Sequence, residues 1–152
     1  MALSSGTGLN VALDKTSSQT STAAGGDASL AVDGNTDTDY QAGSCTQTQD
    51  EADPTWRVDL GQLFMVVKVV IFNRQDCCPE RLNPFNVHIG DSDQVSKNPM
   101  CGGDHQIDVT HPSVDIACDG MEGRYVGVSL PGPSRVLSLC EVQVFFGRLR
   151  FK

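Results

Sequence analysis

The sequence predicts an all-β protein, an antiparallel β-sandwich, and two observations support this prediction. Short runs of β-branched and aromatic residues alternate with polar residues, and turn-forming residues separate the runs. Strong helix signals are absent, while 15 glycines and 7 prolines are spread along the whole length. Several short strands with frequent turns favour a sandwich, whose function we expect on the loops at one end.

The expected strands follow one another along the chain. They cover residues 9–13, 56–60, 66–72, 85–89 and 124–130, then residue 139 with 141–145. Most of them alternate apolar and polar side chains with a period of two, as half-buried strands do. We expect turns at Gly61-Gln62, Gly90-Asp91 and Pro131-Gly132-Pro133. The Ser- and Gly-rich residues 16–29 form either a flexible surface loop or a binding loop over the mouth of the sandwich.

The length and charge set limits on the class of protein. A chain of 152 residues is expected to form one domain, from residue 1 to residue 152. Its net charge is −8, with 19 acidic and 11 basic residues. Nucleic acids and anionic membranes reward basic patches, so we expect neither nucleic-acid binding nor membrane insertion. The acidity is compatible with a cation site.

The six cysteines indicate an oxidising environment. No Cys-x-x-Cys occurs, which argues against a zinc site. We therefore expect a secreted or extracellular protein, or one held in a secretory vesicle. The first residues lack the apolar stretch of a signal peptide, so we expect a mature chain behind an added Met1. No apolar run reaches the roughly 18 residues of a membrane span.

Residues 74–81 are the most informative segment, because two arginines flank two adjacent cysteines. Each guanidinium is a planar fork of donors that suits a ligand rich in oxygen atoms. A bond between Cys77 and Cys78 would give a small rigid apolar surface between the two cations. The alternative is that each cysteine pairs elsewhere and that Arg74 and Arg81 form ordinary salt bridges.

Residues 33–39 place oxygen-bearing side chains at every second position. This spacing resembles the start of an EF-hand loop, but the glycine is second and Ser44 stands where that loop has glutamate. Carboxylates, carboxamides and carbonyls still suit Ca²⁺, and the alternative is a solvated turn. The three histidines, His88, His105 and His111, do not cluster, and we assign them structural or surface roles.

Five segments together resemble the F-type lectins, the fucolectins of fish and invertebrates, over roughly residues 9–146. The most specific is the Arg-x-Asp-Cys-Cys-x-Glu-Arg element. The others are Ala-Val-Asp-Gly-Asn at 31–35, Trp-Arg-Val-Asp-Leu-Gly at 56–61, Gly-Arg-Tyr-Val at 123–126 and Leu-Cys-Glu-Val at 139–142. The resemblance implies a jelly-roll β-sandwich that binds terminal L-fucose without catalysis.

The resemblance also assigns roles to individual residues. Arg74 and Arg81 would hydrogen-bond the sugar, a vicinal disulfide between Cys77 and Cys78 would pack on its ring, and Asp76 would hold an arginine. Tyr40 would lie near the apolar edge of the sugar. The remaining disulfides would be Cys45–Cys140 and Cys101–Cys118, although spacing alone leaves many connectivities open. A structural Ca²⁺ would be held by Leu30, Asp33, Asn35, Ser44, Cys140 and Glu141.

The pocket departs from the family pattern at one position. The family usually carries His where this chain has Gln47. A carboxamide also donates and accepts, but its reach and plane differ from those of imidazole. We therefore expect fucose binding that Gln47 weakens or redirects.

Two other functions compete with the lectin. A discoidin-like module for proteins or membranes fits the sandwich, but the charge and the lack of a hydrophobic loop spike oppose membranes. An enzyme is disfavoured because no Gly-x-Ser-x-Gly, His-Glu-x-x-His or phosphate loop occurs. One shallow sugar site binds weakly, so a lectin would need homo-oligomers or tandem modules. Cell recognition, in innate immunity or between gametes, is the role that the resemblance implies.

Overall fold

The computed structural model describes residues 3–149, so both ends of the expected 1–152 domain, Met1 included, lie outside this range. Within it, strands dominate and the only helices are short 3-10 turns. The strands are β1 (Leu3–Asn10), β2 (Thr16–Gln19), β3 (Thr55–Phe72), β4 (Asn86–Gly90), β5 (Ser113–Ser129) and β6 (Glu141–Leu149). The 3-10 helices are η1 (Ala28–Ala31), η2 (Tyr40–Ala42), η3 (Pro79–Leu82) and η4 (Val95–Lys97). No helix in this range is long and apolar enough to cross a membrane.

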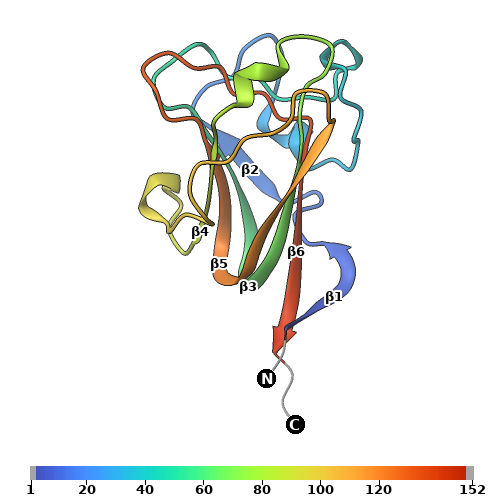
Figure 1. Cartoon of the computed structure of the whole chain (residues 1–152), viewed down its shortest axis with the longest axis vertical. Coiled ribbons are helices and arrows are strands. Elements are labelled where there is room, and N and C mark those ends of the chain that lie inside the picture. Colours follow the sequence, from blue (N-terminus) through green and yellow to red (C-terminus); the bar gives the residue numbers. More distant parts are fainter. Residues whose placement is uncertain (1–2, 150–152) are drawn as a thin grey trace.

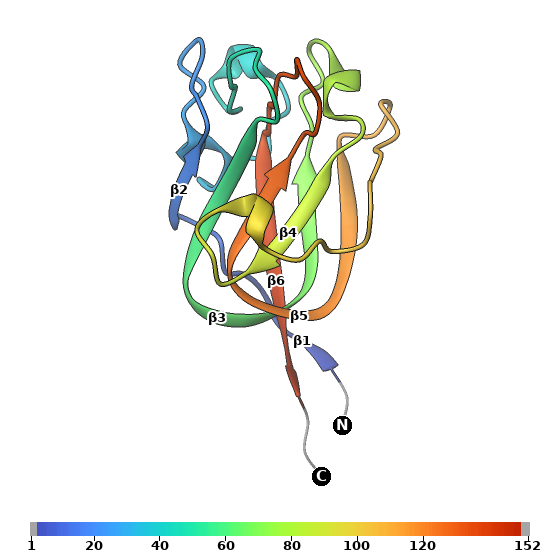
Figure 2. The ribbon, with the colours of Figure 1, turned by 90° about the vertical axis from the view of Figure 1, so that its left-hand side faces the viewer.

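Two bent strands, β3 and β5, contribute to both layers of a sandwich. They pair antiparallel from Thr55 with Ser129 to Phe72 with Ser113, and the register shifts between Asp59 and Phe64. The first arm of β3 pairs with β2, and the last arm of β5 pairs with β4. The last arm of β3 pairs with β6, and β6 in turn pairs with β1. Figure 2 shows both strands turning back at the lower end of the molecule. The expected all-β antiparallel sandwich is confirmed.

Alternating side chains fill the space between the layers. Trp56, Val58 and Leu60 in the first arm of β3 are fully buried, while the residues between them are partly exposed. The indole N–H of Trp56 donates to the carbonyl of Ala28 at 3.0 Å, which ties η1 to the core. Both layers supply the rest of the core, which includes Val66, Val69, Ile71, Val87, Ile89, Val126, Val128, Val142 and Val144.

The turn predicted at Gly61-Gln62 is wrong, because β3 continues through it. Gly61 has a φ of +85°, which glycine adopts without steric cost. Its N–H donates to Oδ1 of Asp59 at 2.8 Å. The glycine therefore bends the strand between the two layers instead of ending it.

Three other boundaries differ from the prediction. The strand expected over 9–13 ends at Asn10, and a turn follows. Residues 16–29 are not all loop, because they contain β2 and the start of η1. The first part of β5, residues 113–123, is missing from the prediction. Its apolar side chains alternate, but Asp119 and Gly120 resemble a turn and interrupt the pattern.

The long loops gather at one end of the sandwich. Figure 1 shows residues 20–54, 73–84 and 130–140 at the top, opposite the ends of β1 and β6 that project at the bottom. This end therefore holds both the Arg-Cys-Cys-Arg segment and the acidic loop that the sequence singles out.

Candidate functional site

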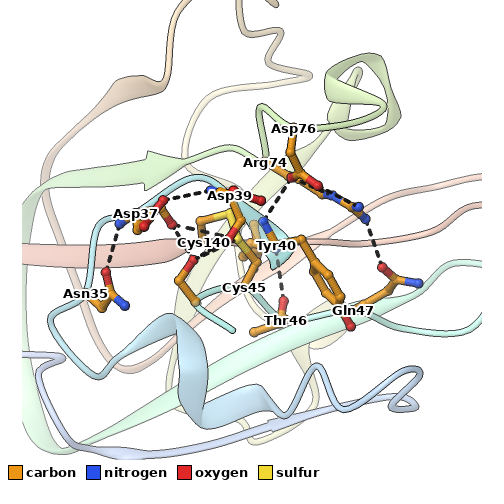
Figure 3. Close-up of a disulfide and its surroundings, with 12 residues drawn as sticks. Asn35, Asp37, Asp39, Tyr40, Cys45, Thr46, Gln47, Arg74, Asp76 and Cys140 are labelled. Carbon is orange, nitrogen blue, oxygen red and sulfur yellow. Dashed lines mark hydrogen bonds and ion pairs between the residues drawn. A yellow bond between two sulfur atoms is a disulfide. The ribbon is translucent and has the colours of Figure 1, made fainter. Parts of the chain in front are cut away.

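Arg74 lies two residues after the end of β3, and three neighbours fix its guanidinium. Asp76 accepts hydrogen bonds from Nε at 2.9 Å and from Nη2 at 3.0 Å in a bidentate ion pair. Oε1 of Gln47 accepts from Nη1 at 3.1 Å, and the Tyr40 ring centroid lies 4.4 Å from the guanidinium carbon. Figure 3 shows this arrangement. One N–H on each terminal nitrogen of Arg74 is left for a ligand.

Tyr40 supports the arginine from the side of η2. Its hydroxyl donates to the carbonyl of Ala24 at 2.7 Å, and its backbone N–H donates to Oδ1 of Asp76 at 2.9 Å. The ring thus packs against Arg74 and links two loops. Its contact with the apolar edge of a sugar stays a prediction.

Asp76 holds Arg74 in the manner expected of it. The hydrogen bonds from Arg74 keep the pKa of Asp76 below its ordinary value of 3.8, and the N–H of Tyr40 acts in the same direction against partial burial. The carboxylate is therefore ionised at neutral pH, and both of its oxygens hold Arg74 in position.

The orientation of the Gln47 amide follows from its partner. A guanidinium has no acceptor, so the Gln47 atom facing Nη1 must be the oxygen. The amide nitrogen, with its two N–H donors, is left for other contacts. The backbone of Gln47 pairs with Gly26 and Ala23, at 2.9 Å in each case. A side chain at Gly26 would collide with the Gln47 backbone nitrogen, 2.3 Å from the position of its Cβ.

Cys77 and Cys78 form a vicinal disulfide, and their Cα atoms lie 3.7 Å apart. Cys78 has a φ of +61°, a left-handed conformation that residues other than glycine seldom adopt. This turn leads directly into η3, which carries Arg81. The Arg81 side chain is exposed, and its guanidinium has no hydrogen-bond or ion-pair partner among residues 3–149. It is therefore available to a ligand.

Two residues that the sequence did not single out anchor η3. Asn73 is buried, and its Nδ2 donates to the carbonyl of Pro79 at 2.9 Å. Arg135 donates from Nη2 to the carbonyls of Arg81 at 3.1 Å, Asn83 at 3.0 Å and Pro84 at 3.0 Å. The position of Asn73 just before Arg74 was the one available signal; nothing local to Arg135 indicated its role.

The acidic loop is a series of side-chain-to-backbone turns. The backbone N–H of Asn35 donates to Asp33 at 2.9 Å, that of Asp37 to Asn35 at 3.0 Å, and that of Asp39 to Asp37 at 3.0 Å. These bonds occupy one carboxylate oxygen each of Asp33 and Asp37 and the single amide oxygen of Asn35, so the two aspartates each keep a second oxygen for other contacts.

Glu141 lies next to this loop, at the start of β6, and is fully buried. Burial raises the pKa of Glu141 to about 8, the N–H of Gly34 opposes this, and the neighbouring Asp33 raises it further. Oε2 accepts from Gly34 at 2.7 Å, whereas Oε1 has no hydrogen-bond partner among the residues that the structure describes. An orphaned carboxylate oxygen beside a second carboxylate is the environment that a bound cation would satisfy.

The other expected cation ligands lie on the same loops. Leu30 is in η1, and the Cys45–Cys140 disulfide joins the chain next to Ser44 to the chain next to Glu141. The hydroxyl of Ser44 donates to the carbonyls of Asp37 at 2.6 Å and Asp39 at 3.0 Å. The described residues contain no group of three His, Cys, Asp or Glu side chains that could hold a metal. The expected set instead combines two carboxylates with backbone and hydroxyl oxygens.

All three disulfides pair as the resemblance implied: Cys45–Cys140, Cys77–Cys78 and Cys101–Cys118. The first two lie at the loop end, beside the cation loop and Arg74 respectively. Arg74 contacts Asp76, Gln47 and Tyr40, and Tyr40 also donates to Asp76. The Cys77–Cys78 turn leads from this cluster to Arg81.

Comparison with known proteins defines the class first. Residues 30–128 match the family model described as "NedA-like, galactose-binding domain". The fucolectin of Anguilla anguilla is 41% identical over 125 residues, which are 80% of this chain and 78% of that protein. The chain belongs to the fucolectin family, the F-type lectins, whose members are non-catalytic carbohydrate-binding modules.

Two solved structures extend the comparison to the fold. A fucolectin from the serum of Morone saxatilis, the striped bass, superimposes with a TM-score of 0.88 at 36% identity, over 98% of this chain and 51% of that one. The lectin domain of lectinolysin complexed with Lewis b antigen gives a TM-score of 0.83 at 35% identity, over 91% of this chain and 97% of that one. This chain spans 65% of fucolectin-1 of Anguilla japonica, so it corresponds to one part of several relatives.

Proposed function

We propose that the chain is a lectin that binds terminal L-fucose on glycans through Arg74, Arg81 and Gln47, beside the Cys77–Cys78 disulfide. The observation that supports this best is the fixed guanidinium of Arg74, one turn from Arg81, whose guanidinium has no partner among residues 3–149. Both arginines and the Gln47 amide nitrogen are donors, and the hydroxyl and ring oxygens of a sugar accept hydrogen bonds. The disulfide offers an apolar surface to the methyl-bearing side of a deoxy-sugar. The names of the related fucolectins and the Lewis b complex agree with this ligand class.

The proposed site includes a structural Ca²⁺. Asp33 and Glu141 would supply carboxylate oxygens, Leu30, Asn35 and Cys140 backbone carbonyls, and Ser44 its hydroxyl. The orphaned oxygen of Glu141 and its raised pKa support a cation there. When bound, Ca²⁺ would neutralise the paired carboxylates and hold together the loops that Cys45–Cys140 joins.

The biological setting follows from the ligand and the cysteines. We propose that the protein is secreted, since three disulfides persist in an oxidising compartment. A single shallow site would bind weakly, so useful avidity would come from homo-oligomers or tandem copies. Recognition of microbial or host glycans, or of gametes, is the corresponding role.

The first test is a calorimetric titration with L-fucose of the parent chain and of Arg81→Ala. The loss of charge-assisted hydrogen bonds, each contributing about 1.5–3 kcal/mol, predicts a fall in affinity of at least about tenfold. The melting temperature should change by no more than a few degrees, because the Arg81 side chain is exposed and has no partner in the described part of the chain.

Arg124→Ala is the matched control. Arg124 is also exposed and forms a bidentate pair with Asp59, at 2.7 Å and 2.9 Å, away from the Arg74 loops. Its removal should leave fucose affinity unchanged. Equal affinities for the parent and for Arg81→Ala would refute the proposed site.

A further inference from the structure

A cavity lies at the sheet edge formed by β4, and it shares no lining residue with the Arg74 site. Its volume is about 400 Å³, which is in the range of small-molecule sites. Its walls include Asp53, Thr55, Asn86, His88, Ser129 and Pro131. None of these residues belongs to the proposed fucose or calcium sites.

The strand register places three of these side chains in one row. Ser129 of β5 is paired with Asn86 of β4 on one side and with Thr55 of β3 on the other. The adjacent Val87 and Val128 point into the core. Because side chains alternate along a strand, the row and His88 face away from the core. The segment with η4, which Figure 2 shows in front of β4, covers this face, and Val95 packs on Gly127.

The polar groups of this cavity are buried to an unusual degree for residues outside the core. Asn86 is 5% exposed, His88 is 8% exposed and Ser129 is 9% exposed. Polar side chains that are buried this far normally have their hydrogen bonds satisfied within the protein. Within the described residues, each of these three side chains has one polar atom with a long hydrogen bond or none: Nε2 of His88, Oδ1 of Asn86 and Oγ of Ser129.

His88 presents an acceptor to the cavity. Its Nδ1 lies 2.7 Å from the carbonyl oxygen of Asn98, and a carbonyl can only accept, so Nδ1 carries the proton. In the neutral ring Nε2 then holds a lone pair. The hydrogen-bond partner of Nε2 within the described chain is Oγ of Ser129, at the long distance of 3.4 Å. A ligand hydroxyl would be a better donor.

Asn86 and Asp53 present acceptors as well. Nδ2 of Asn86 donates to Asp104 at 2.7 Å, so Oδ1 is the atom left for the cavity. Oδ1 of Asp53 accepts from the N–H of Gly132 at 2.8 Å, and its second oxygen is left over. Among the described residues, no Lys or Arg lines the cavity. The hydrogen-bonding character is thus opposite to that of the Arg74 site, where the free groups are donors.

We propose that this cavity is a second ligand site that binds a small polyol through the hydroxyl donors of the ligand. Its acceptors, Nε2 of His88, Oδ1 of Asn86 and the carboxylate of Asp53, match a chain of hydroxyls, and the ring of Pro131 supplies an apolar wall. An ammonium group on the polyol strengthens binding through Asp53, whereas a carboxylate on it prevents binding. This site shares no lining residue with the proposed fucose site.

The test follows the imidazole ¹⁵N signals of His88 during titration with three acyclic polyols of one carbon skeleton. Sorbitol is neutral, glucamine carries an ammonium and gluconate carries a carboxylate, and all three are flexible enough to adapt to the cavity. Sorbitol and glucamine should shift the Nε2 signal as it accepts a hydrogen bond, with glucamine binding more tightly. Gluconate should leave the signal unchanged.

Two variants locate the effect. Ser129→Leu fills the cavity and should abolish both titrations, with L-fucose binding serving as the check on folding. Asp53→Asn keeps an oxygen for Gly132 and removes the charge, so it should weaken glucamine about tenfold and sorbitol much less. The proposal is overturned if no polyol moves the His88 signal, if gluconate binds as well as sorbitol, or if Asp53→Asn leaves glucamine unaffected. The Asp53 result decides the matter even if Ser129→Leu fails to fold.

Discussion

Arg74 and Arg81 differ in how firmly the protein holds their side chains. Arg74 is 11% exposed and held by Asp76, Gln47 and Tyr40. Arg81 is exposed and unpaired within the described residues. Arg74 is therefore preorganised, and little side-chain entropy is lost when it binds a ligand. Arg81 must be ordered on binding, so the rigidity of η3 determines how much it contributes.

Gln47 leads to a prediction about pH. The proposed fucose site contains no histidine, the side chain that normally changes charge between about pH 5 and pH 8. The pKa of Asp76 is lowered below 3.8, so its ion pair with Arg74 is complete above that value and is lost only as pH falls through the lowered pKa. With Ca²⁺ saturating, fucose affinity should therefore be constant over the range.

Gln47→His supplies the comparison. A neutral imidazole can accept from Arg74, whereas an imidazolium cannot and also repels it. Fucose affinity of this variant should fall as pH drops through about 6.5. Titrations at several pH values measure both curves. A pH-dependent step in the parent, or none in the variant, would contradict the assigned orientation of Gln47.

At the scale of the element, η3 depends on Arg135 for its position. One guanidinium holds the carbonyls of Arg81, Asn83 and Pro84. Arg135→Gln should release η3 and lower fucose affinity roughly tenfold, because several charge-assisted hydrogen bonds are lost and Arg81 is no longer held. Titration with L-fucose measures the loss.

Arg135→Lys distinguishes positioning from general destabilisation. Lysine keeps the charge but lacks the planar fork, so it should recover part of the affinity. Arg124→Gln, at an exposed ion pair elsewhere, should have no effect on affinity. If Arg135→Gln lowers the melting temperature but not the affinity, Arg135 has no positioning role.

The elements also show how far sequence reasoning reaches. Alternation located the arms of β3 and the strand β4, because a half-buried strand must place apolar side chains at every second residue. The bend at Gly61 was mistaken for a turn, since glycine favours both. The first part of β5 was missed because Asp119 and Gly120 mask its pattern. Whether a strand bends at such a glycine depends on its packing against the second layer of the sandwich. The residues of that layer are far away in the sequence, so a short segment does not reveal the bend.

The sequence could name the residue types of the candidate site, but it could not give the contacts between them. The Arg-Cys-Cys-Arg segment is contiguous, so the resemblance could name Arg74, the disulfide and Arg81 directly. The contacts of Arg74 with Gln47 and Tyr40 span 27 and 34 positions. Asn73 and Arg135 donate hydrogen bonds to backbone carbonyls. Every residue has such a carbonyl, so the sequence does not indicate which ones are bound. These features needed the folded chain.

At the scale of the whole molecule, the cation site should couple stability to calcium. Buried Glu141 beside Asp33 is unfavourable when both are ionised and nothing lies between them. Ca²⁺ at about a hundredfold excess over its dissociation constant would contribute about 2.7 kcal/mol, or several degrees in melting temperature. Chelation should remove this increment and weaken fucose binding, because the same loops carry both sites.

Glu141→Gln tests the cause of this coupling. The variant removes the buried charge, so its melting temperature should no longer respond to Ca²⁺. In chelator it should melt at or above the parent's temperature. Asp115→Asn is a suitable control, because the Asp115 side chain is exposed, pairs with Lys68, and lies on β5, which β3 separates from the β6 strand of Glu141. A calcium response that survives in Glu141→Gln would show that the cation binds elsewhere.

The most direct measurement of the central claim is a crystal structure of the chain with L-fucose and Ca²⁺. We expect the sugar between the guanidiniums of Arg74 and Arg81, with its apolar side on the Cys77–Cys78 disulfide and Gln47 donating to it through the amide nitrogen. A sugar bound at any other surface, with both arginines free of it, would contradict the account.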